Sequence, residues 1–430
     1  MTGLELLERR LRELGVQRIY GLPLGGLQHV AVEDPDVAVL LADADGRLGH
    51  HDGSGRLGAA HLAGPILHLS SEPGGRAPLQ TIGSIEEALD ALIDPPGMTV
   101  PGTLALHLDL DLAAEVSDDL VAAVQPERQP VLTLDPSLAG LDLVIVVGPG
   151  VVRANAVDDL HTLSRSAGAG VVNTWGAKGV ERWDSPYHFG TAGLQERDFE
   201  LAGVAAADVV LTSGLDPEES PVGSLGSYVV QDVPPAQLAA LTQSWPRNHR
   251  IPQRPPLYDA LAAVVTPRYE SDAVPLTAAR ASLHLSGALP DQGIAVADAG
   301  RSGFWIARTF PTSIPGSVCV PATRTDGFAA AAAFVCGLEG RPCLAVTDQL
   351  DGPEGVDDMT TEVLELAEAL EVPVALQLWG ERGSMADSGA HVELLSRSLE
   401  DRGVRLDDVP VDLGDTAELE RVAGPLRAWA

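Results

Sequence analysis

Residues 143–150 read LVIVVGPG, residues 170–173 read GVVN, and residues 209–214 read VVLTSG. Each is a short aliphatic run that leads into glycine or a polar residue, which is typical of a buried parallel strand followed by a turn. Helical periodicity over 156–167 lies between the first two runs. Strands that alternate with helices in this way predict a parallel sheet covered by helices on both faces, the doubly wound α/β arrangement.

The alternation continues on both sides of this segment. Toward the C-terminus we expect helices at 328–338 and 360–370 and strands at 293–297, 343–346 and 373–378. Toward the N-terminus we expect a loop rich in Asp, Gly and His at 43–56, helices at 4–14 and 84–92, and strands at 17–20, 37–41, 65–69 and 103–110. Ser84 is a plausible N-cap for the second of these helices.

The domain organisation follows from the composition of the connecting segments. A proline-rich connection between residues 234 and 256 separates the middle of the chain from its last third. We therefore predict three consecutive doubly wound parallel-sheet domains, at 1–118, 119–270 and 271–430.

Charge and composition exclude several classes of protein. The chain has 430 residues and a net charge of −33, with 61 acidic residues against 28 basic ones, and Lys178 is its only lysine. Nucleic-acid binding needs a basic patch, so we expect none. No apolar run approaches the ~18 residues that cross a membrane, and the acidic first helix is no secretory signal, so we expect a cytoplasmic protein. The three cysteines form no C-x-x-C pair, which disfavours disulfides and structural zinc.

The chain resembles the thiamine-diphosphate-dependent enzymes of the acetolactate synthase type over nearly its whole length. The segments that carry the resemblance are Gly15-Val16 with Ile19–Pro23, Leu104–Leu110, Gly148-Pro149-Gly150, Asn173-Thr174-Trp175-Gly176-Ala177-Lys178-Gly179, Tyr187–Gly190, Ile294–Gly300 and Cys343–Asp348. The resemblance implies a pyrimidine-binding domain, a middle domain and a diphosphate-binding domain. It also implies thiamine diphosphate with Mg²⁺, and a reaction that decarboxylates a 2-oxo acid and transfers a two-carbon unit. Family members build the site between two subunits, so we expect a homodimer or homotetramer.

The first domain departs from the family at the glutamate that protonates the aminopyrimidine ring. This glutamate should follow the strand expected at 37–41, where the chain reads Ala42-Asp43-Ala44-Asp45-Gly46. Asp43 and Asp45 are therefore weak candidates to replace it. An aspartate is one methylene shorter than a glutamate, and a proton donor misplaced by ~1 Å loses much of its effect.

The last domain departs from the family at the cofactor's diphosphate. The Gly-Asp-Gly motif reads Thr347-Asp348-Gln349, the metal-binding asparagine falls near Trp379-Gly380-Glu381, and the hydrophobic residue that props the cofactor falls near Asp326. Both motif glycines, which let backbone approach the phosphates, are absent. The candidate metal ligands are Asp348, Asp351 and Glu381. The candidate cofactor-binding residues are Asp298, Arg301, Ser302, Asp326, Gly327, Thr347 and Gln349.

These departures favour a homologue that has lost standard cofactor binding and catalysis and acts as a pseudoenzyme or binds another ligand. We then expect no resident cofactor, and a small anionic ligand could meet Arg301 and Arg324. One alternative is an active decarboxylase or carboligase that uses thiamine diphosphate and Mg²⁺ in an atypical site. A second alternative is a nucleotide-binding protein that uses the middle domain. FAD is not expected there, because Pro149 lacks a backbone donor and no third glycine completes the fingerprint.

Three further groups of residues have both a chemical and a structural interpretation. The acidic segment Asp348, Asp351, Glu354, Asp357 and Asp358 could hold a divalent cation or form a solvated loop. The histidines at 50, 51, 61 and 68 could bind a metal or be polar loop residues. Lys178 could form an imine, or have the structural role that the family resemblance implies.

Overall fold

The structure is a computed structural model that describes residues 1–51, 53, 55–72, 78–93, 95, 102–116, 141–219, 225, 230–245, 247–248, 250–351 and 355–429. The chain divides into two compact units, residues 1–50 with 54–130 and residues 51–53 with 131–430. The domain boundaries at 118 and 270 stay predictions. Within the described ranges, no helix is both long and apolar enough to cross a membrane.

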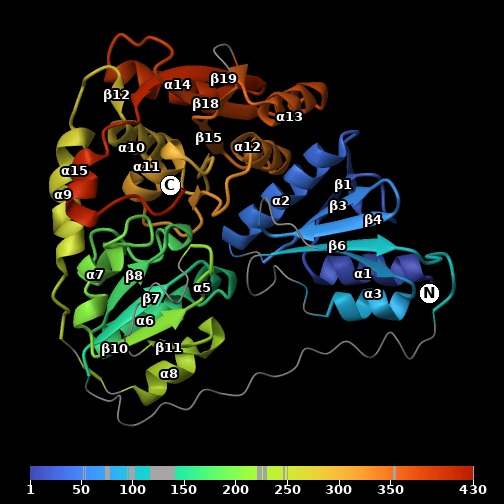
Figure 1. Ribbon diagram of the computed structural model, residues 1–430, viewed down its shortest axis with the longest axis horizontal. Coiled ribbons are helices and arrows are strands. Elements are labelled where there is room, and N and C mark those ends of the chain that lie inside the picture. The colour runs from blue at the N-terminus through green and yellow to red at the C-terminus, as the bar shows by residue number, and fades with distance from the viewer. Residues whose placement is uncertain are drawn as a thin grey trace. The chain divides into compact units, whose positions relative to one another are not determined.

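The N-terminal unit is a six-stranded sheet with helices against it (Figure 1). Its strands are β1 (Arg18–Gly21), β2 (Gln28–Ala31), β3 (Gly58–Leu62), β4 (Ile66–Ser70), β5 (Leu79–Ile82) and β6 (Thr103–Leu108), in the order β2-β1-β3-β4-β6-β5. The predicted helices at its two ends are confirmed as α1 (Gly3–Glu13) and α3 (Ile85–Ala91), and Ser84 caps α3.

The sheet of this unit is mixed, whereas the sequence predicted a parallel one. Strand β4 pairs antiparallel with both β3 and β6, and the other pairs are parallel. Only residues 63–65 connect β3 to β4. A parallel crossover needs a dozen residues or more, so this connection can make only a hairpin.

Helix α2 (Pro35–His51) replaces a predicted strand and most of a predicted loop. The strand expected at 37–41 was wrong, and so was the loop expected at 43–56 up to residue 51. Asp34 begins the helix, because its Oδ1 accepts hydrogen bonds from the N–H groups of Asp36 (2.7 Å) and Val37 (3.1 Å). Gly46 belongs to the helix because a Cβ there would lie 1.9 Å from the carbonyl oxygen of Ser70. This glycine therefore reflects close packing of the helix on the sheet.

The middle domain has a five-stranded, wholly parallel sheet, as the sequence predicted. Its strands are β7 (Leu143–Val147), β8 (Gly170–Asn173), β9 (His188–Thr191), β10 (Val209–Ser213) and β11 (Val230–Asp232), in the order β11-β10-β7-β8-β9. Its helical segments are α5 (Gly150–Arg153), α6 (Val157–Ala167), η2 (Trp175–Ala177), α7 (Asp198–Leu201), η3 (Val204–Ala206), η5 (Pro235–Gln237) and α8 (Leu238–Ser244). Helix α8 lies inside the predicted proline-rich connection, which is therefore more structured than expected.

The C-terminal domain has a second parallel sheet, of six strands. These are β12 (Leu276–Thr277), β13 (Ile294–Ala297), β14 (Val318–Cys319), β15 (Cys343–Thr347), β18 (Val374–Gly380) and β19 (Val404–Asp412), in the order β12-β19-β18-β15-β13-β14. A small hairpin joins β16 (Leu350–Asp351) to β17 (Gly355–Val356). The helices are α9 (Pro256–Tyr269), α10 (Ala278–Ala288), α11 (Arg301–Thr309), α12 (Phe328–Glu339), α13 (Asp358–Ala369), α14 (Ser388–Glu400) and α15 (Ala417–Ala423).

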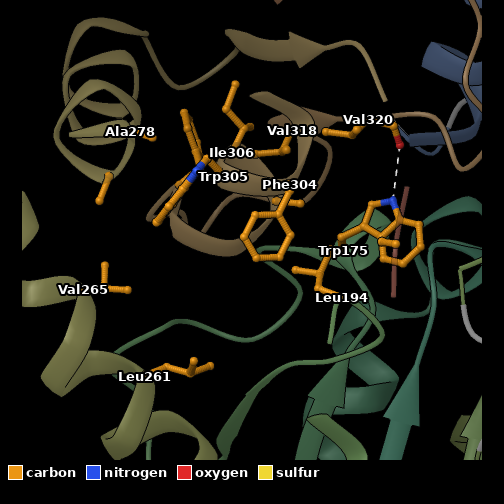
Figure 2. Packing of buried hydrophobic residues seen from close by; sticks show 14 of the residues in the cluster. Trp175, Leu194, Leu261, Val265, Ala278, Phe304, Trp305, Ile306, Val318 and Val320 are labelled. Carbon is orange, nitrogen blue, oxygen red and sulfur yellow. Dashed lines mark hydrogen bonds between the residues drawn. The ribbon is translucent and has the colours of Figure 1, made fainter. Parts of the chain in front are cut away.

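The middle and C-terminal domains share one hydrophobic core. Figure 2 shows Trp175 and Leu194 of the middle domain beside Phe304 and Val320 of the C-terminal domain. The Trp175 indole N–H donates to the Val320 carbonyl oxygen at 3.3 Å. Helix α9 contacts β9 and α7 of the middle domain and also α10 and α15 of the C-terminal domain. The two domains are thereby held in one arrangement, which fixes the sites described next.

Candidate functional site

The carboxyl ends of β13 and β15 bring together most of the predicted site residues. These strands are neighbours in a parallel sheet, so the residues after them meet at one edge. A cavity of about 780 Å³ lies there, lined by Ala299, Gly300, Arg301, Arg324, Asp326, Asp348, Gln349, Asp357, Asp358 and Met359. We call it the C-terminal cavity.

Asp348 is held at the N-terminus of α11. Its Oδ1 accepts hydrogen bonds from the Ser302 hydroxyl at 2.6 Å and from the Ser302 N–H at 3.3 Å. The first N–H groups of a helix have no partner within the helix and attract anions. Here the protein's own carboxylate occupies that position, which a phosphate oxygen would otherwise take.

Asp298 has the same relation to the next helix. It is fully buried, and its Oδ1 accepts from the Ala329 N–H of α12 at 2.8 Å. Its Oδ2 has no hydrogen-bond partner. Burial raises the pKa of Asp298 to about 7, although hydrogen bonds from Thr347 and Ala329 oppose this. The N-terminus of α12 is thus bound by the protein's own Asp298 carboxyl group, as that of α11 is by Asp348.

Gly327 and Thr347 shape the wall of this site. Gly327 precedes α12 with φ +77°, and a Cβ there would lie 2.9 Å from the Cβ of Met359. Thr347 is buried, and its hydroxyl accepts from the Gln349 N–H at 3.1 Å. Both predicted residues therefore lie beside the cavity in supporting positions.

The C-terminal cavity carries more negative than positive groups. Its lining has two guanidinium groups, on Arg301 and Arg324, and four carboxyl groups, on Asp326, Asp348, Asp357 and Asp358. Asp357 is committed to α13, where its two oxygens accept from the Thr360 N–H (2.8 Å) and hydroxyl (2.7 Å). A polyanion entering here would meet like charge without a bridging cation.

The donor set does not fit thiamine diphosphate with Mg²⁺. Mg²⁺ requires near-octahedral oxygen ligands. In the segment Trp379-Gly380-Glu381, near which the resemblance implies a metal-binding asparagine, the buried Trp379 donates its indole N–H to Gln377 at 2.9 Å. Among the residues that the structure describes, no group of three His, Cys, Asp or Glu side chains could hold a metal ion. Of the described side chains predicted as metal ligands, Asp348 alone lines the C-terminal cavity, and Ser302 already binds it.

Two predicted metal ligands are not brought to this site. Glu381 is exposed beyond the end of β18 and is absent from the cavity lining described above. The side chain of Asp351 and the whole of Glu354 lie outside the described residues. The side chains of His50 and His51 do so as well, while His61 meets the Pro23 carbonyl at 3.1 Å.

Asp43 and Asp45 lie on the buried face of α2 in the N-terminal unit. Asp43 contacts the Nε2 of His68 at 2.8 Å. Asp45 accepts from the Arg56 Nε–H at 2.8 Å and from the Tyr20 hydroxyl at 2.9 Å. Both carboxylates are thus engaged in a buried polar network of their own unit.

Glu33 is the residue that the sequence reasoning missed. The second parallel strand of the N-terminal unit is β2, and Glu33 follows it after one buried residue, directly before the cap of α2. Its side chain is exposed. Because the strand was predicted at 37–41, the glutamate was expected near Asp43, about ten residues after Glu33. The acidic pair Glu33-Asp34 before Pro35 is typical of the start of a helix and could have indicated that the strand ends before it.

The middle-domain turn Gly148-Pro149-Gly150 is closed by its own neighbours. The Gly148 N–H donates to the Ser213 carbonyl at 3.0 Å, and the Gly150 N–H donates to the Gly214 carbonyl at 2.9 Å. A Cβ on Gly148 would lie 2.3 Å from that same Gly214 oxygen. These glycines serve close packing of two turns, so their N–H groups are not free for a phosphate.

Comparison with known proteins finds a matching family model and solved structures of similar fold. Residues 142–241 match the family model described as thiamine pyrophosphate enzyme, central domain. A solved structure described as a "putative thiamin diphosphate-dependent enzyme" from Mycobacterium smegmatis superposes with a TM-score of 0.60, over 96% of this chain and 99% of that chain, at 14% identity. At this identity the likeness concerns the fold alone. No curated protein matches.

Proposed function

We propose that this chain, which belongs by its central domain and its fold to the thiamine pyrophosphate enzyme family, is a non-catalytic homologue. It is of acetolactate synthase-like descent and does not hold thiamine diphosphate with Mg²⁺ in the standard manner. The observation that carries this proposal is the Asp348 carboxylate at the N-terminus of α11, where Ser302 binds it.

The electrostatics of the C-terminal cavity support the same conclusion. Diphosphate is a polyanion, and four carboxyl groups line the cavity against two guanidinium groups. A divalent cation could offset this repulsion, but the resemblance implies a second side-chain ligand near Trp379, whose indole donates to Gln377. Binding would therefore require Asp348 to leave Ser302 and would still lack a complete ligand set.

A thermal melt with cofactor tests this proposal. A ligand present at 100 times its dissociation constant stabilises a protein by ~2.7 kcal/mol. We expect no shift in melting temperature with millimolar thiamine diphosphate and Mg²⁺. A shift that requires both components and disappears in Asp348→Ala would overturn the proposal. Mg²⁺ with inorganic diphosphate serves as the control for binding of the diphosphate end alone.

A second candidate function is an active enzyme with an atypical site, and Glu33 is the observation that favours it. Its position after β2 matches the place where the family resemblance implies the glutamate that protonates the aminopyrimidine. Under this alternative the melt shift occurs, and a 2-oxo acid is consumed with release of CO₂. Glu33→Gln would then abolish turnover with little change in stability, because the side chain is exposed.

We also propose that the chain is a cytoplasmic homodimer. Sedimentation of the purified chain at two concentrations would test the assembly, since a dimer has twice the mass of the 44.8 kDa chain. A monomer at every concentration would contradict it.

A further inference from the structure

A second cavity lies where the middle domain, α9 and the C-terminal domain meet. Its volume is about 340 Å³, which is within the range of small-ligand sites. Much of its lining is apolar or aromatic, including Tyr258, Leu261, Val265, Tyr269 and Phe310. We call it the interdomain cavity.

The chain's only lysine lines this cavity. Lys178 follows η2, and the next residue, Gly179, has φ +92° and would place a Cβ 2.4 Å from the Ile314 carbonyl oxygen. The loop is therefore pressed against the C-terminal domain, which fixes the position of Lys178. Among the described residues, no carboxylate pairs with its ammonium group, and the only charged group that acts on it is the Arg308 guanidinium.

Two further nitrogen-bearing side chains line the cavity and are incompletely satisfied. His188 is buried, and its Nδ1 has no hydrogen-bond partner. Arg308 is buried and uses its terminal nitrogens on Asp198 and on the Thr191 carbonyl, but its Nε has no partner. Both nitrogens are enclosed by protein atoms, so these side chains add polar character and, from Arg308, positive charge beside Lys178.

The acidic groups near the cavity are already engaged. Glu181 lines it, but its carboxylate contacts Arg165 at 3.2 Å and His161 at 3.6 Å. Asp198 is bound to Arg308 at 2.8 Å.

The other titratable or charged groups near the cavity also have interaction partners. The Tyr269 hydroxyl donates to the Thr309 carbonyl oxygen, and Arg254 lies 4.1 Å above the Tyr258 ring. The cavity is thus positive at one end and apolar elsewhere.

Burial has a measurable consequence for the positive end. It lowers the pKa of Lys178 to about 7, with a smaller contribution from Arg308. It lowers the pKa of His188 to about 3, with contributions from Lys178 and Arg254. An anion beside these groups would offset both effects, because opposite charge favours the protonated form.

We propose that the interdomain cavity binds a small carboxylic acid with an apolar body, its carboxylate on the ammonium group of Lys178. The apolar part lies among the side chains of α9 and Phe310. A monocarboxylate matches the positive groups, and the apolar walls disfavour a polyanion such as a nucleotide. This inference is independent of the proposed function, because it uses none of the residues of the C-terminal cavity.

Calorimetric titration with 3-phenylpropanoate, and with 3-phenylpropanamide as its uncharged analogue, tests the proposal. We expect saturable 1:1 binding of the acid and at least tenfold weaker binding of the amide. Only the ammonium form of Lys178 pairs with a carboxylate, so the affinity should fall by up to tenfold per pH unit above pH 7. No saturable binding up to ~10 mM, or equal binding of acid and amide, would overturn the proposal.

Matched variants separate the cavity from general charge. Lys178→Met should weaken binding at least tenfold, and Lys178→Arg should restore part of it. Arg182→Gln removes one positive charge from the same loop, where Arg182 is exposed and pairs with Asp184, and should change nothing. Unchanged affinity in Lys178→Met would contradict the proposal.

A labelling experiment on the unmodified chain does not depend on any variant folding. Trinitrobenzenesulfonate attacks neutral amines, and Lys178 is the only lysine, so its peptide reports directly on the cavity by mass spectrometry. We expect 3-phenylpropanoate to protect Lys178 and to leave the N-terminal amine reactive. Equal labelling with and without the acid would refute binding at Lys178.

Discussion

The C-terminal and interdomain cavities handle charge in opposite ways. At the C-terminal cavity, Asp348 accepts from an N–H group of α11, and the buried Asp298 beside it accepts from one of α12, so acids and helix termini satisfy one another. In the interdomain cavity, Lys178 has no acidic partner among the described residues, and Arg308 leaves one nitrogen unpaired. The first arrangement is complete without a ligand, whereas the second gains from an anion. Although the chain has a net charge of −33, the cavity better suited to a ligand is the interdomain one, where the charged group is the Lys178 ammonium.

The largest expected effect concerns the ion pair that supports the interdomain cavity. Arg308 and Asp198 are both buried and bind through two contacts of 2.8 and 2.9 Å. Arg308→Met leaves the carboxylate buried without its partner, so we expect a loss of ~3–5 kcal/mol in the free energy of unfolding. Denaturant titration followed by circular dichroism measures it.

Arg197→Met is the matched control for this variant. Arg197 pairs with Glu200 at 2.8 Å on the same segment, but both side chains are about half exposed. Exposed pairs contribute ~0–1 kcal/mol. Equal losses in the two variants would mean that burial does not set the strength of the pair at this cavity.

The next effect is a pH dependence that originates at Asp298, which is buried beside the C-terminal cavity. The folded pKa of Asp298 is about 7, above its value of ~3.9 in the unfolded chain. The folded state therefore binds more protons between these values, so its contribution to stability is full below pH ~4. That contribution falls by at most ~1.4 kcal/mol per pH unit up to pH ~7 and is constant above it.

Asp298→Asn should remove this pH dependence, because the amide stays uncharged and can still accept from the Ala329 N–H through its oxygen. Denaturant titrations at pH 5, 6, 7 and 8 compare the variant with the wild type. The difference in unfolding free energy should change most between pH 5 and 7 and level off by pH 8, because the folded state loses its proton around pH 7. A constant difference over the whole range would show that Asp298 does not titrate in the folded state.

A smaller effect tests whether Asp348 excludes anions from the N-terminus of α11. Asp348→Asn removes a charged acceptor from the Ser302 N–H and hydroxyl, so we expect a loss of ~1 kcal/mol in stability. The same change should strengthen binding of inorganic diphosphate, measured by calorimetry. Unchanged diphosphate affinity would mean that Asp348 does not control access. Asp412→Asn, at the exposed end of β19, is the control.

Much of the fold was predictable because it rests on local patterns. Aliphatic runs before glycine identified β7, β8 and β10, and the parallel middle sheet followed from their alternation with helices. Helix α2 was not predictable in this way, because a five-residue apolar run fits a helix or a strand equally well. Gly46 added a misleading loop signal, and its cause, the Ser70 carbonyl, lies 24 residues away in the sequence.

The candidate sites were predictable to the extent that topology assembles them. Asp298, Arg301, Asp348 and Gln349 follow adjacent parallel strands, so their convergence on one edge follows from the strand order. The hydrogen bond that joins Asp348 to Ser302 depends on side-chain placement, which no spacing encodes. The setting of Lys178 depends on α9 and on Arg308, 130 positions later in the chain. Glu33 was not considered because the strand was predicted at 37–41, whereas β2 ends at Ala31.

The smallest expected effect separates the two cavities most directly. Arg301 is exposed at the start of α11 and lines only the C-terminal cavity, whereas Lys178 lines only the interdomain one. Arg301→Gln should change the free energy of unfolding by less than ~0.5 kcal/mol, as is usual for surface substitutions. It should leave 3-phenylpropanoate binding unchanged, because the affinity depends on charge that is buried with the ligand. If Arg301→Gln weakens binding as much as Lys178→Met, the acid is drawn by net charge alone and the distinction between the cavities fails.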